Sequence, residues 1–71
     1  MIEYYGKNVN IIAQNGLHFS GKVTDYFYPE DNESGVESIA IKDVYSDNYV
    51  EFPEEDIKSI EIMDYYQPKT I

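Results

Sequence analysis

The dipeptide Asn15-Gly16 stands between two stretches that have the character of β-strands. Both residues adopt positive φ readily, as the two-residue turn of a β-hairpin requires, so Asn-Gly in this setting is a strong hairpin signal. Residues 9–13, before the turn, are rich in β-branched side chains. The sequence therefore predicts that one strand ends at this turn and that a second strand begins after it.

The segment after the turn alternates with the period of two that is typical of a strand. Its predicted apolar face carries Leu17, Phe19, Gly21, Val23 and Phe27. Its predicted polar face carries His18, Ser20, Lys22, Thr24, Tyr26 and Tyr28. Glycine weakens a flat strand, but it suits a strand that bends around a small barrel. Gly21 therefore favours a curved sheet that closes on itself.

A polar loop and a second hairpin follow. Residues 29–35 combine proline, glycine and like charges, so they are predicted to form a mobile loop. Alternation resumes over residues 36–44, and the polar residues 46–48 predict a tight turn into a strand at 49–52.

Proline and acidic residues at 53–56 are typical of a single 3-10 turn. The isoleucines after it predict a last strand over residues 59–62. Residues 64–71 have no periodicity and are expected to fray. The chain, residues 1–71, is thus predicted to be one small barrel domain whose ordered part spans about residues 6–63.

The chain has 71 residues, no cysteine and one histidine. Disulfide frameworks and zinc fingers are therefore excluded as supports for its small core. Tight closure of β-structure and self-association are the remaining sources of stability. We expect an all-β, five-stranded small barrel.

The order of these segments resembles that of a Src-homology-like barrel. The residues that carry the resemblance are Asn15-Gly16, Gly21-Lys22-Val23 and residues 52–60, Phe-Pro-Glu-Glu-Asp-Ile-Lys-Ser-Ile. That barrel has five short strands with a 3-10 turn before the last one. The resemblance covers roughly residues 6–63 and implies the same fold for this chain.

The first half of the chain also resembles the first motif of the Sm and LSm family, through Asn15-Gly16, Gly21, Val23 and Asp25. In that family, RNA binding depends on a loop asparagine soon after the aspartate and on an Arg-Gly pair in the second motif. Here residues 26–30 read Tyr-Phe-Tyr-Pro-Glu, and residues 39–43 contain neither arginine nor glycine. The resemblance implies an Sm-like barrel without the family's RNA-binding residues.

Five lysines, no arginine and fourteen carboxylates give a net charge of −9. This charge repels phosphate backbones and disfavours nucleic acid, whereas it suits a basic protein surface or simply solubility. Glu54, Glu55 and Asp56 either stabilise the 3-10 turn that they begin or form part of a patch for a basic partner. The first residues include neither a basic stretch nor an apolar run, so we expect a cytoplasmic protein without a membrane segment.

Catalytic and metal sites find little support. His18 is the only imidazole, and the residues near it in the sequence provide no catalytic partner. The loop that begins at Glu30 resembles the start of a calcium loop, with Asn32, Ser34 and Gly35 at matching positions. The twelfth position of a calcium loop requires glutamate, and here that position is Ile41. We therefore expect no enzyme, no metal and no cofactor.

Tyrosine is abundant, with eight residues. Tyr26 and Tyr28 share the predicted outward face of the second strand, and Tyr45 and Tyr49 flank the turn at 46–48. Tyrosine is common in binding hot spots, and aromatic residues near the long loops line the peptide groove of Src-homology-like barrels, although such residues also cover core edges. We predict these four tyrosines as the candidate partner surface.

These observations favour a non-enzymatic, acidic interaction module that binds a protein or associates with itself through the edges of its last two strands. Two alternatives stay open. One is an Sm-like protein that binds RNA or single-stranded nucleic acid, and the other is a phage or mobile-element inhibitor whose acidic surface imitates nucleic acid.

Overall fold

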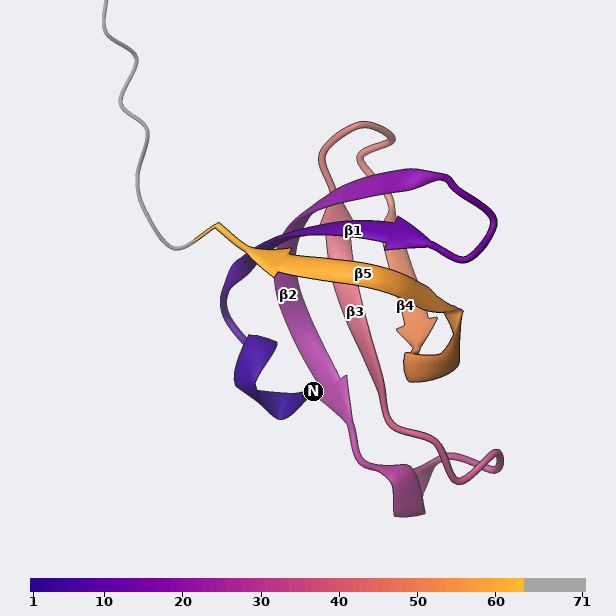
Figure 1. Ribbon diagram of the computed structural model, residues 1–71. Helices are drawn as coiled ribbons and strands as arrows, with labels where there is room; N and C mark the ends of the chain where they lie inside the picture. Colours follow the sequence, from indigo (N-terminus) through magenta and orange to yellow (C-terminus); the bar gives the residue numbers. More distant parts are fainter. Residues whose placement is uncertain (64–71) are drawn as a thin grey trace, which may run out of the picture.

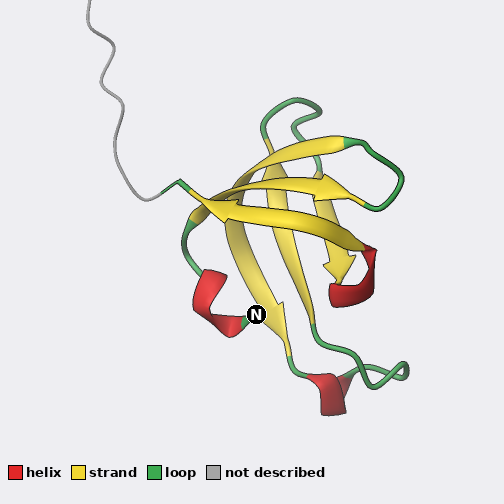
Figure 2. Ribbon diagram, viewed as in Figure 1, coloured by secondary structure: helices red, strands yellow, loops and turns green. Residues whose placement is uncertain are grey.

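The computed structural model describes residues 1–63, which form one antiparallel sheet (Figure 1). Its strands are β1 (Asn8–Ala13), β2 (His18–Phe27), β3 (Ser38–Asp43), β4 (Tyr49–Pro53) and β5 (Ile57–Ile62). Three 3-10 turns, drawn in red in Figure 2, are η1 (Ile2–Tyr4), η2 (Pro29–Asp31) and η3 (Glu54–Asp56). The predicted all-β fold is confirmed, with five strands and a 3-10 turn before the last of them. The fraying predicted for residues 64–71 lies outside the described residues.

The strands lie in the order β4-β3-β2-β1-β5, so β4 and β5 are the two edges. β4 and β5 do not pair with each other, so the sheet is open. The strand pairing therefore does not show the closed barrel that the sequence predicts. The sheet is nevertheless strongly curved: β2 and β3 run steeply across the pair formed by β1 and β5 (Figure 1). Figure 1 also shows η3 linking β4 to β5 at one corner of the sheet.

Gly21 lies where β2 passes from one partner strand to the other. It is paired with Val9 of β1 and also with Asp43 of β3. A Cβ atom added to Gly21 would overlap the backbone carbonyl oxygen of Lys42 and would lie 2.8 Å from its carbonyl carbon. Glycine is thus required here because two backbones approach closely.

A β-bulge at Thr24 inverts the side-chain pattern in the second half of β2. Val23 is opposite Ile41 and Asp25 is opposite Ala40, so Thr24 has no partner of its own. Beyond the bulge, Tyr26 packs against the core. The predicted outward position of Tyr26 is therefore wrong, because one extra residue shifts all later side chains to the other face.

The core lies on the concave side of the sheet. Its buried apolar members are Val9, Ile11, Ala13, Val23, Ile39, Ile41 and Phe52. Burying one large aliphatic or aromatic side chain contributes about 1.5–3 kcal/mol. Leu17, by contrast, is 57% exposed, although the alternation predicts it in the core. It lies in the connection between β1 and β2, where the strand period does not apply.

The N-terminal residues complete this core. Met1 and Tyr4 of the η1 region are half-buried and pack against the core cluster. The predicted ordered part begins near residue 6, so it leaves this segment out. Three residues of 3-10 turn carry little local signal, and their position depends on contacts with distant strands.

Candidate functional site

The four predicted tyrosines form two separate pairs. Tyr26 is opposite Ile39 near the start of β3, and Tyr49 is opposite Lys42 near its end. The side chain of Ile39 points into the core, whereas Lys42 lies on the other face of β3. The structure therefore places the two pairs at opposite ends of β3, with Tyr26 and Tyr49 on opposite faces of the sheet.

Tyr45 and Tyr49 belong to the connection between β3 and β4, which we call the turn end (residues 43–49). Both side chains are exposed, Tyr45 at 74% and Tyr49 at 68%. The ammonium nitrogen of Lys42 lies 4.8 Å from the centroid of the Tyr49 ring and 3.5 Å from Oδ1 of Asp47. The ring of Tyr49 thus already faces a cation of its own chain.

The carboxylate of Asp43 organises the turn end. It accepts hydrogen bonds from the backbone N–H of Ser20 at 3.1 Å and from the N–H and hydroxyl of Ser46 at 2.9 and 2.8 Å. Burial alone would raise the pKa of Asp43, but these hydrogen bonds outweigh it and lower that pKa below its usual range. Asp43 therefore has a structural role.

Tyr26 and Tyr28 are held together at the other end of β3. Their ring centroids are 4.9 Å apart and the rings are nearly perpendicular, at 87°. The Tyr26 hydroxyl donates a hydrogen bond of 2.6 Å to Oε1 of Glu37. The same oxygen accepts a hydrogen bond of 2.7 Å from the Met1 ammonium group. One carboxylate thus connects β2, the N-terminus and the segment before β3.

These contacts shift the titration of the groups involved. The hydrogen bond to Glu37 is the main cause that raises the pKa of Tyr26 to about 12. The hydrogen bond from the Met1 ammonium is the main cause that lowers the pKa of Glu37. Burial would lower the pKa of the Met1 ammonium, but the hydrogen bonds to Glu37 and Glu3 raise it. All three groups therefore favour the protonation states that hold this contact together at neutral pH.

Tyr26 and Tyr28 border a hollow of about 310 Å³, which we call the tyrosine hollow. Its lining consists of Ile2, Tyr5, Asp25, Tyr26 and Tyr28. The two N-terminal residues reach it because the chain after them runs beside β2. The N–H of Gly6 donates to the carbonyl oxygen of Val23 at 3.0 Å, and the N–H of Val23 donates to the carbonyl oxygen of Lys7 at 2.9 Å.

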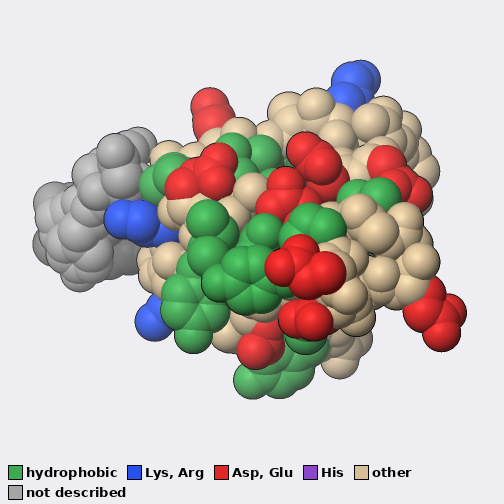
Figure 3. All heavy atoms as spheres, turned by 90° about the horizontal axis from the view of Figure 1, so that it is seen from below, with side chains coloured by type: hydrophobic (Ala, Val, Ile, Leu, Met, Phe, Trp, Pro, Cys, Tyr) green, Lys and Arg blue, Asp and Glu red, His purple; other side chains and the backbone are tan. Residues whose placement is uncertain are grey.

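The surface at the tyrosine hollow combines exposed apolar side chains with carboxylates. Ile2 is 51% exposed, Tyr5 is 58% exposed and Tyr28 is 48% exposed. Figure 3 shows the face that carries η1 and η2, where acidic side chains lie among and around the apolar ones and lysines lie toward the margins. Monomeric proteins usually leave such apolar side chains scattered, so their gathering here indicates an interaction surface.

The acidic surround comes from separate parts of the chain. Glu37 is bonded to Tyr26, and Glu30 lies near enough to contribute to the raised pKa of Tyr26. Glu3 and Glu54 line a neighbouring hollow together with Met1 and Tyr4. Lys58 lines that neighbouring hollow but not the tyrosine hollow.

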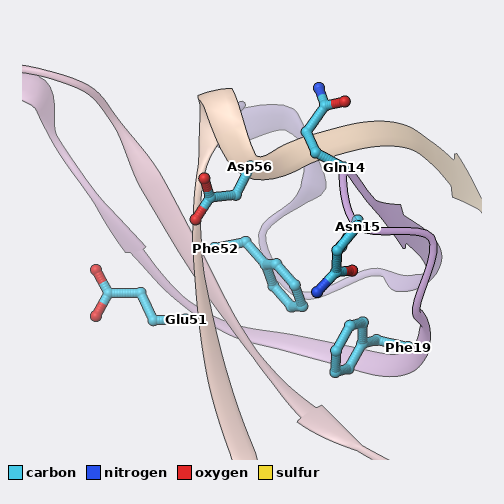
Figure 4. Close-up of a pocket in the computed structure, with 7 residues that line it drawn as sticks. Gln14, Asn15, Phe19, Glu51, Phe52 and Asp56 are labelled. Carbon is cyan, nitrogen blue, oxygen red and sulfur yellow. The ribbon is translucent and has the colours of Figure 1, made fainter.

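A further hollow, of about 320 Å³, lies at the end of the core beside the β1–β2 connection (Figure 4). The rings of Phe19 and Phe52 meet edge to face there, with centroids 4.9 Å apart. In Figure 4 the Asn15 side chain lies beside the Phe52 ring and above the Phe19 ring, and the carboxylate of Glu51 lies apart from both. The side-chain oxygen of Asn15 accepts a hydrogen bond from the N–H of Leu17. This hollow marks the end of the core, and polar side chains of Gln14, Asn15, Glu51 and Asp56 complete its lining around the two rings.

Sequence reasoning missed Ile2, Tyr5 and Glu37 as members of this site. The only local signal for the first two is Gly6, whose φ of +78° allows the chain to turn after Tyr5. Glu37 carries no signal of its own, because its partners are a distant tyrosine and the chain terminus.

The other residues considered from the sequence have local roles or none. His18 is exposed, and together with Tyr45 it lines a separate hollow of about 280 Å³. In the loop that resembles a calcium site, the side chain of Asn32 donates to the carbonyl oxygen of Val36, and Ser34 accepts from the N–H of Val36. The part of the chain that the structure describes contains no cluster of three metal-ligating side chains. It also contains no helix that is long and apolar enough to cross a membrane.

Comparisons of the chain with protein-family models, with curated proteins and with solved structures give no significant match.

Proposed function

We propose that the protein is a non-enzymatic interaction module that binds a basic surface of another protein through the tyrosine hollow and the acidic residues around it. One observation carries this proposal. Three exposed apolar side chains, Ile2, Tyr5 and Tyr28, border a single hollow together with the carboxylate of Asp25. Rigid aromatic groups supply contact area in binding hot spots, and the carboxylates select a partner of opposite charge.

The charge of the whole chain supports a basic partner. A net charge of −9 accelerates the encounter with a positively charged surface and opposes contact with phosphate groups. The lysines are also too few to form a track along a nucleic-acid backbone, and the chain has no arginine. This balance favours a protein partner over the Sm-like RNA-binding alternative.

We also propose that the curved sheet is a small barrel of the Sm-like or Src-homology-like kind. The bend of β2 around Gly21 and the η3 link between β4 and β5 support this architecture. In a closed barrel, nuclear Overhauser contacts would connect β5 with β4 at residues beyond those that flank η3. Their absence in a fully assigned spectrum would favour an open, curved sheet.

Affinity capture from the native cells tests the function directly. The bait is the wild-type chain, beside a charge-reversed variant with Glu3→Lys, Glu30→Lys and Glu54→Lys. We expect a basic protein that binds the wild type, is released by high salt and is lost with the variant. A captured protein that binds both baits equally, or one released by nuclease treatment, would contradict the proposal.

Self-association is a second candidate, and the sheet order favours it. β4 and β5 are both edge strands, so within residues 1–63 each has one side without a strand partner. Pairing of β4 from one copy with β5 from the next would satisfy both edges. Light scattering coupled to size exclusion should then give a mass that is a multiple of 8.3 kDa. A strict monomer at high concentration would exclude this candidate.

A further inference from the structure

We infer that the tyrosine hollow receives the guanidinium group of an arginine side chain from the basic partner, an inference that rests on the proposed function. The hollow offers tyrosine rings and a carboxylate together, and this pair of groups binds an organic cation in two ways. The rings attract positive charge through their π-electrons, and the carboxylate accepts its hydrogen bonds.

The tyrosine rings are prepared for such a ligand. Tyr26 is fixed by its hydrogen bond to Glu37, and Tyr28 packs against Tyr26 at nearly a right angle. Tyr28 nevertheless keeps 48% of its surface exposed, and Tyr5 keeps 58%. A cation that enters the hollow therefore meets aromatic surface without first displacing a packed side chain, which lowers the cost of ordering on binding.

Asp25 supplies the negative charge at the hollow. Its side chain is exposed, and its Oδ2 atom accepts a hydrogen bond of 3.1 Å from the hydroxyl of Thr24, the bulge residue. That contact orients the carboxylate and leaves hydrogen-bonding capacity for an incoming N–H group. No lysine lines the hollow, so within the described residues the chain supplies no side-chain cation of its own to this site.

The turn end gives an internal comparison for this inference. There the ring of Tyr49 is covered by Lys42, which also contacts Asp47. The chain thus already places a cation between a tyrosine and an aspartate at one site. At the tyrosine hollow the same two residue types occur without the lysine.

Arginine suits this hollow better than lysine does. A guanidinium group is planar, is less strongly hydrated than an ammonium group, and stacks on aromatic rings while it donates to a carboxylate. The compact ammonium group of lysine loses more hydration in the same position. We therefore expect a preference for arginine over lysine within a peptide of otherwise identical sequence.

A titration followed by nuclear magnetic resonance tests the inference on the full chain labelled with ¹⁵N. Three short Gly/Ser peptides differ only at the central residue, which is arginine, lysine or the neutral isostere citrulline. We expect saturable shifts of the Tyr5, Asp25 and Tyr28 amide signals with the arginine peptide, a weaker response to lysine and none to citrulline. Asp25→Asn should weaken binding of the arginine peptide about two- to fivefold, and Asp47→Asn at the turn end should leave it unchanged.

Several results would overturn the inference. These are equal shifts with citrulline or lysine, shifts confined to another surface, or unchanged binding by the Asp25→Asn variant. Asp25 is exposed and the change is isosteric, so a loss of folding would not obscure the result. If a captured basic partner binds the wild type and the Asp25→Asn variant equally, the arginine inference fails while the proposed function stands. If no basic partner is captured, the proposed function fails whatever the peptides do.

Discussion

The tyrosine hollow and the turn end contain the same kinds of side chain but arrange them differently. At the turn end, Tyr45 and Tyr49 extend from a tight connection, and Lys42 covers one of the two rings. At the tyrosine hollow, Tyr26 and Tyr28 support each other beside the N-terminal segment and border a concavity. Tyr45 also borders a hollow, with residues of β1, β2 and β5. The tyrosine hollow differs in that both of its tyrosines border one concavity, whereas at the turn end Tyr49 is covered by Lys42.

The bulge at Thr24 creates this difference. Without the extra residue, Tyr26 would lie on the face that Lys22 occupies, away from the N-terminal segment. With the bulge, Tyr26 reaches Glu37 and packs beside the core. Bulges occur often next to functional sites because they redirect a side chain without ending the strand.

Gly21→Ala should have the largest effect and should disrupt both regions together. The added methyl group would overlap the Lys42 carbonyl group where β2 pairs with β3. A small core of this kind supplies about 3–5 kcal/mol of stability, which we expect the overlap to remove. Circular dichroism and urea unfolding would measure the loss.

Gly35→Ala is the matched control. No atom lies within 4 Å of a Cβ added at Gly35, and only its φ of +75° opposes the change. The left-handed conformation costs about 1–2 kcal/mol, so this variant should fold and unfold at a lower urea concentration. If both variants are equally stable, the close approach at Gly21 is not essential.

Changes in pH should separate the two ends. The lowered pKa values of Asp43 and Glu37 mean that both contribute stability above their usual values of 3.8 and 4.5 and lose it as the pH falls below them. The raised pKa values of the Met1 ammonium and of Tyr26 mean that both contribute stability below 8.0 and 10.0, respectively. These contributions are lost as the pH rises toward the folded-state values, about 12 for Tyr26.

Acid should therefore loosen both ends, and alkali should loosen the tyrosine hollow first. The ring signals of Tyr26 and Tyr45 in ¹H–¹³C spectra would report on the two ends separately. We expect the Tyr26 signals to change between pH 8 and about 12 before those of Tyr45 reflect any loss of structure. If Tyr45 shows structural change at a lower pH than Tyr26 does, the Glu37 contact is not the first contact that alkali breaks, and the prediction is wrong.

Asp43→Asn should affect the turn end alone. The amide keeps one acceptor oxygen for the three donors that the carboxylate serves, so the Ser46 contacts weaken. Hydrogen exchange at residues 44–48 should accelerate, while the amides of Tyr5 and Tyr28 keep their protection. A uniform loss of protection would show that the two ends are not independent.

Lys42→Met should have the smallest effect. The change removes the cation above Tyr49 but keeps an unbranched apolar side chain, so the expected loss is about 0.5–1 kcal/mol in thermal or urea unfolding. It also leaves Tyr49 open to a cation without providing a pocket. Amide shifts at the turn end on addition of the arginine peptide would show that a pocket is unnecessary.

Local sequence signals predicted the strands well. The signals at Asn15-Gly16, in the alternation after it and at Pro53 each act over a few residues, and the strands are where these signals predict them. The strand ends differ: β3 spans 38–43 where 36–44 was expected, and β5 begins at Ile57 where residue 59 was expected. The candidate site was predicted only in part. Tyr26 and Tyr28 were identified, but their face was inverted because no feature of the sequence marks the bulge at Thr24.

The rest of the site depends on contacts between distant segments. Ile2 and Tyr5 reach the hollow because the next residues, Gly6 and Lys7, make backbone hydrogen bonds to Val23. Glu37 precedes β3 and meets Tyr26 on the neighbouring strand β2. Such contacts follow from the bend of β2 and from the position of the N-terminus, which periodicity along the chain does not encode.

The most direct test of the central claim compares how Tyr28→Ala and Tyr45→Ala bind the captured basic partner. Each change removes one exposed tyrosine ring, one from the tyrosine hollow and one from the turn end. We predict that Tyr28→Ala raises the dissociation constant about tenfold or more, as loss of a hot-spot tyrosine does, and that Tyr45→Ala leaves it within about twofold of the wild type. Equal effects of the two substitutions, or a larger effect of Tyr45→Ala, in variants whose spectra show intact folding would contradict the claim.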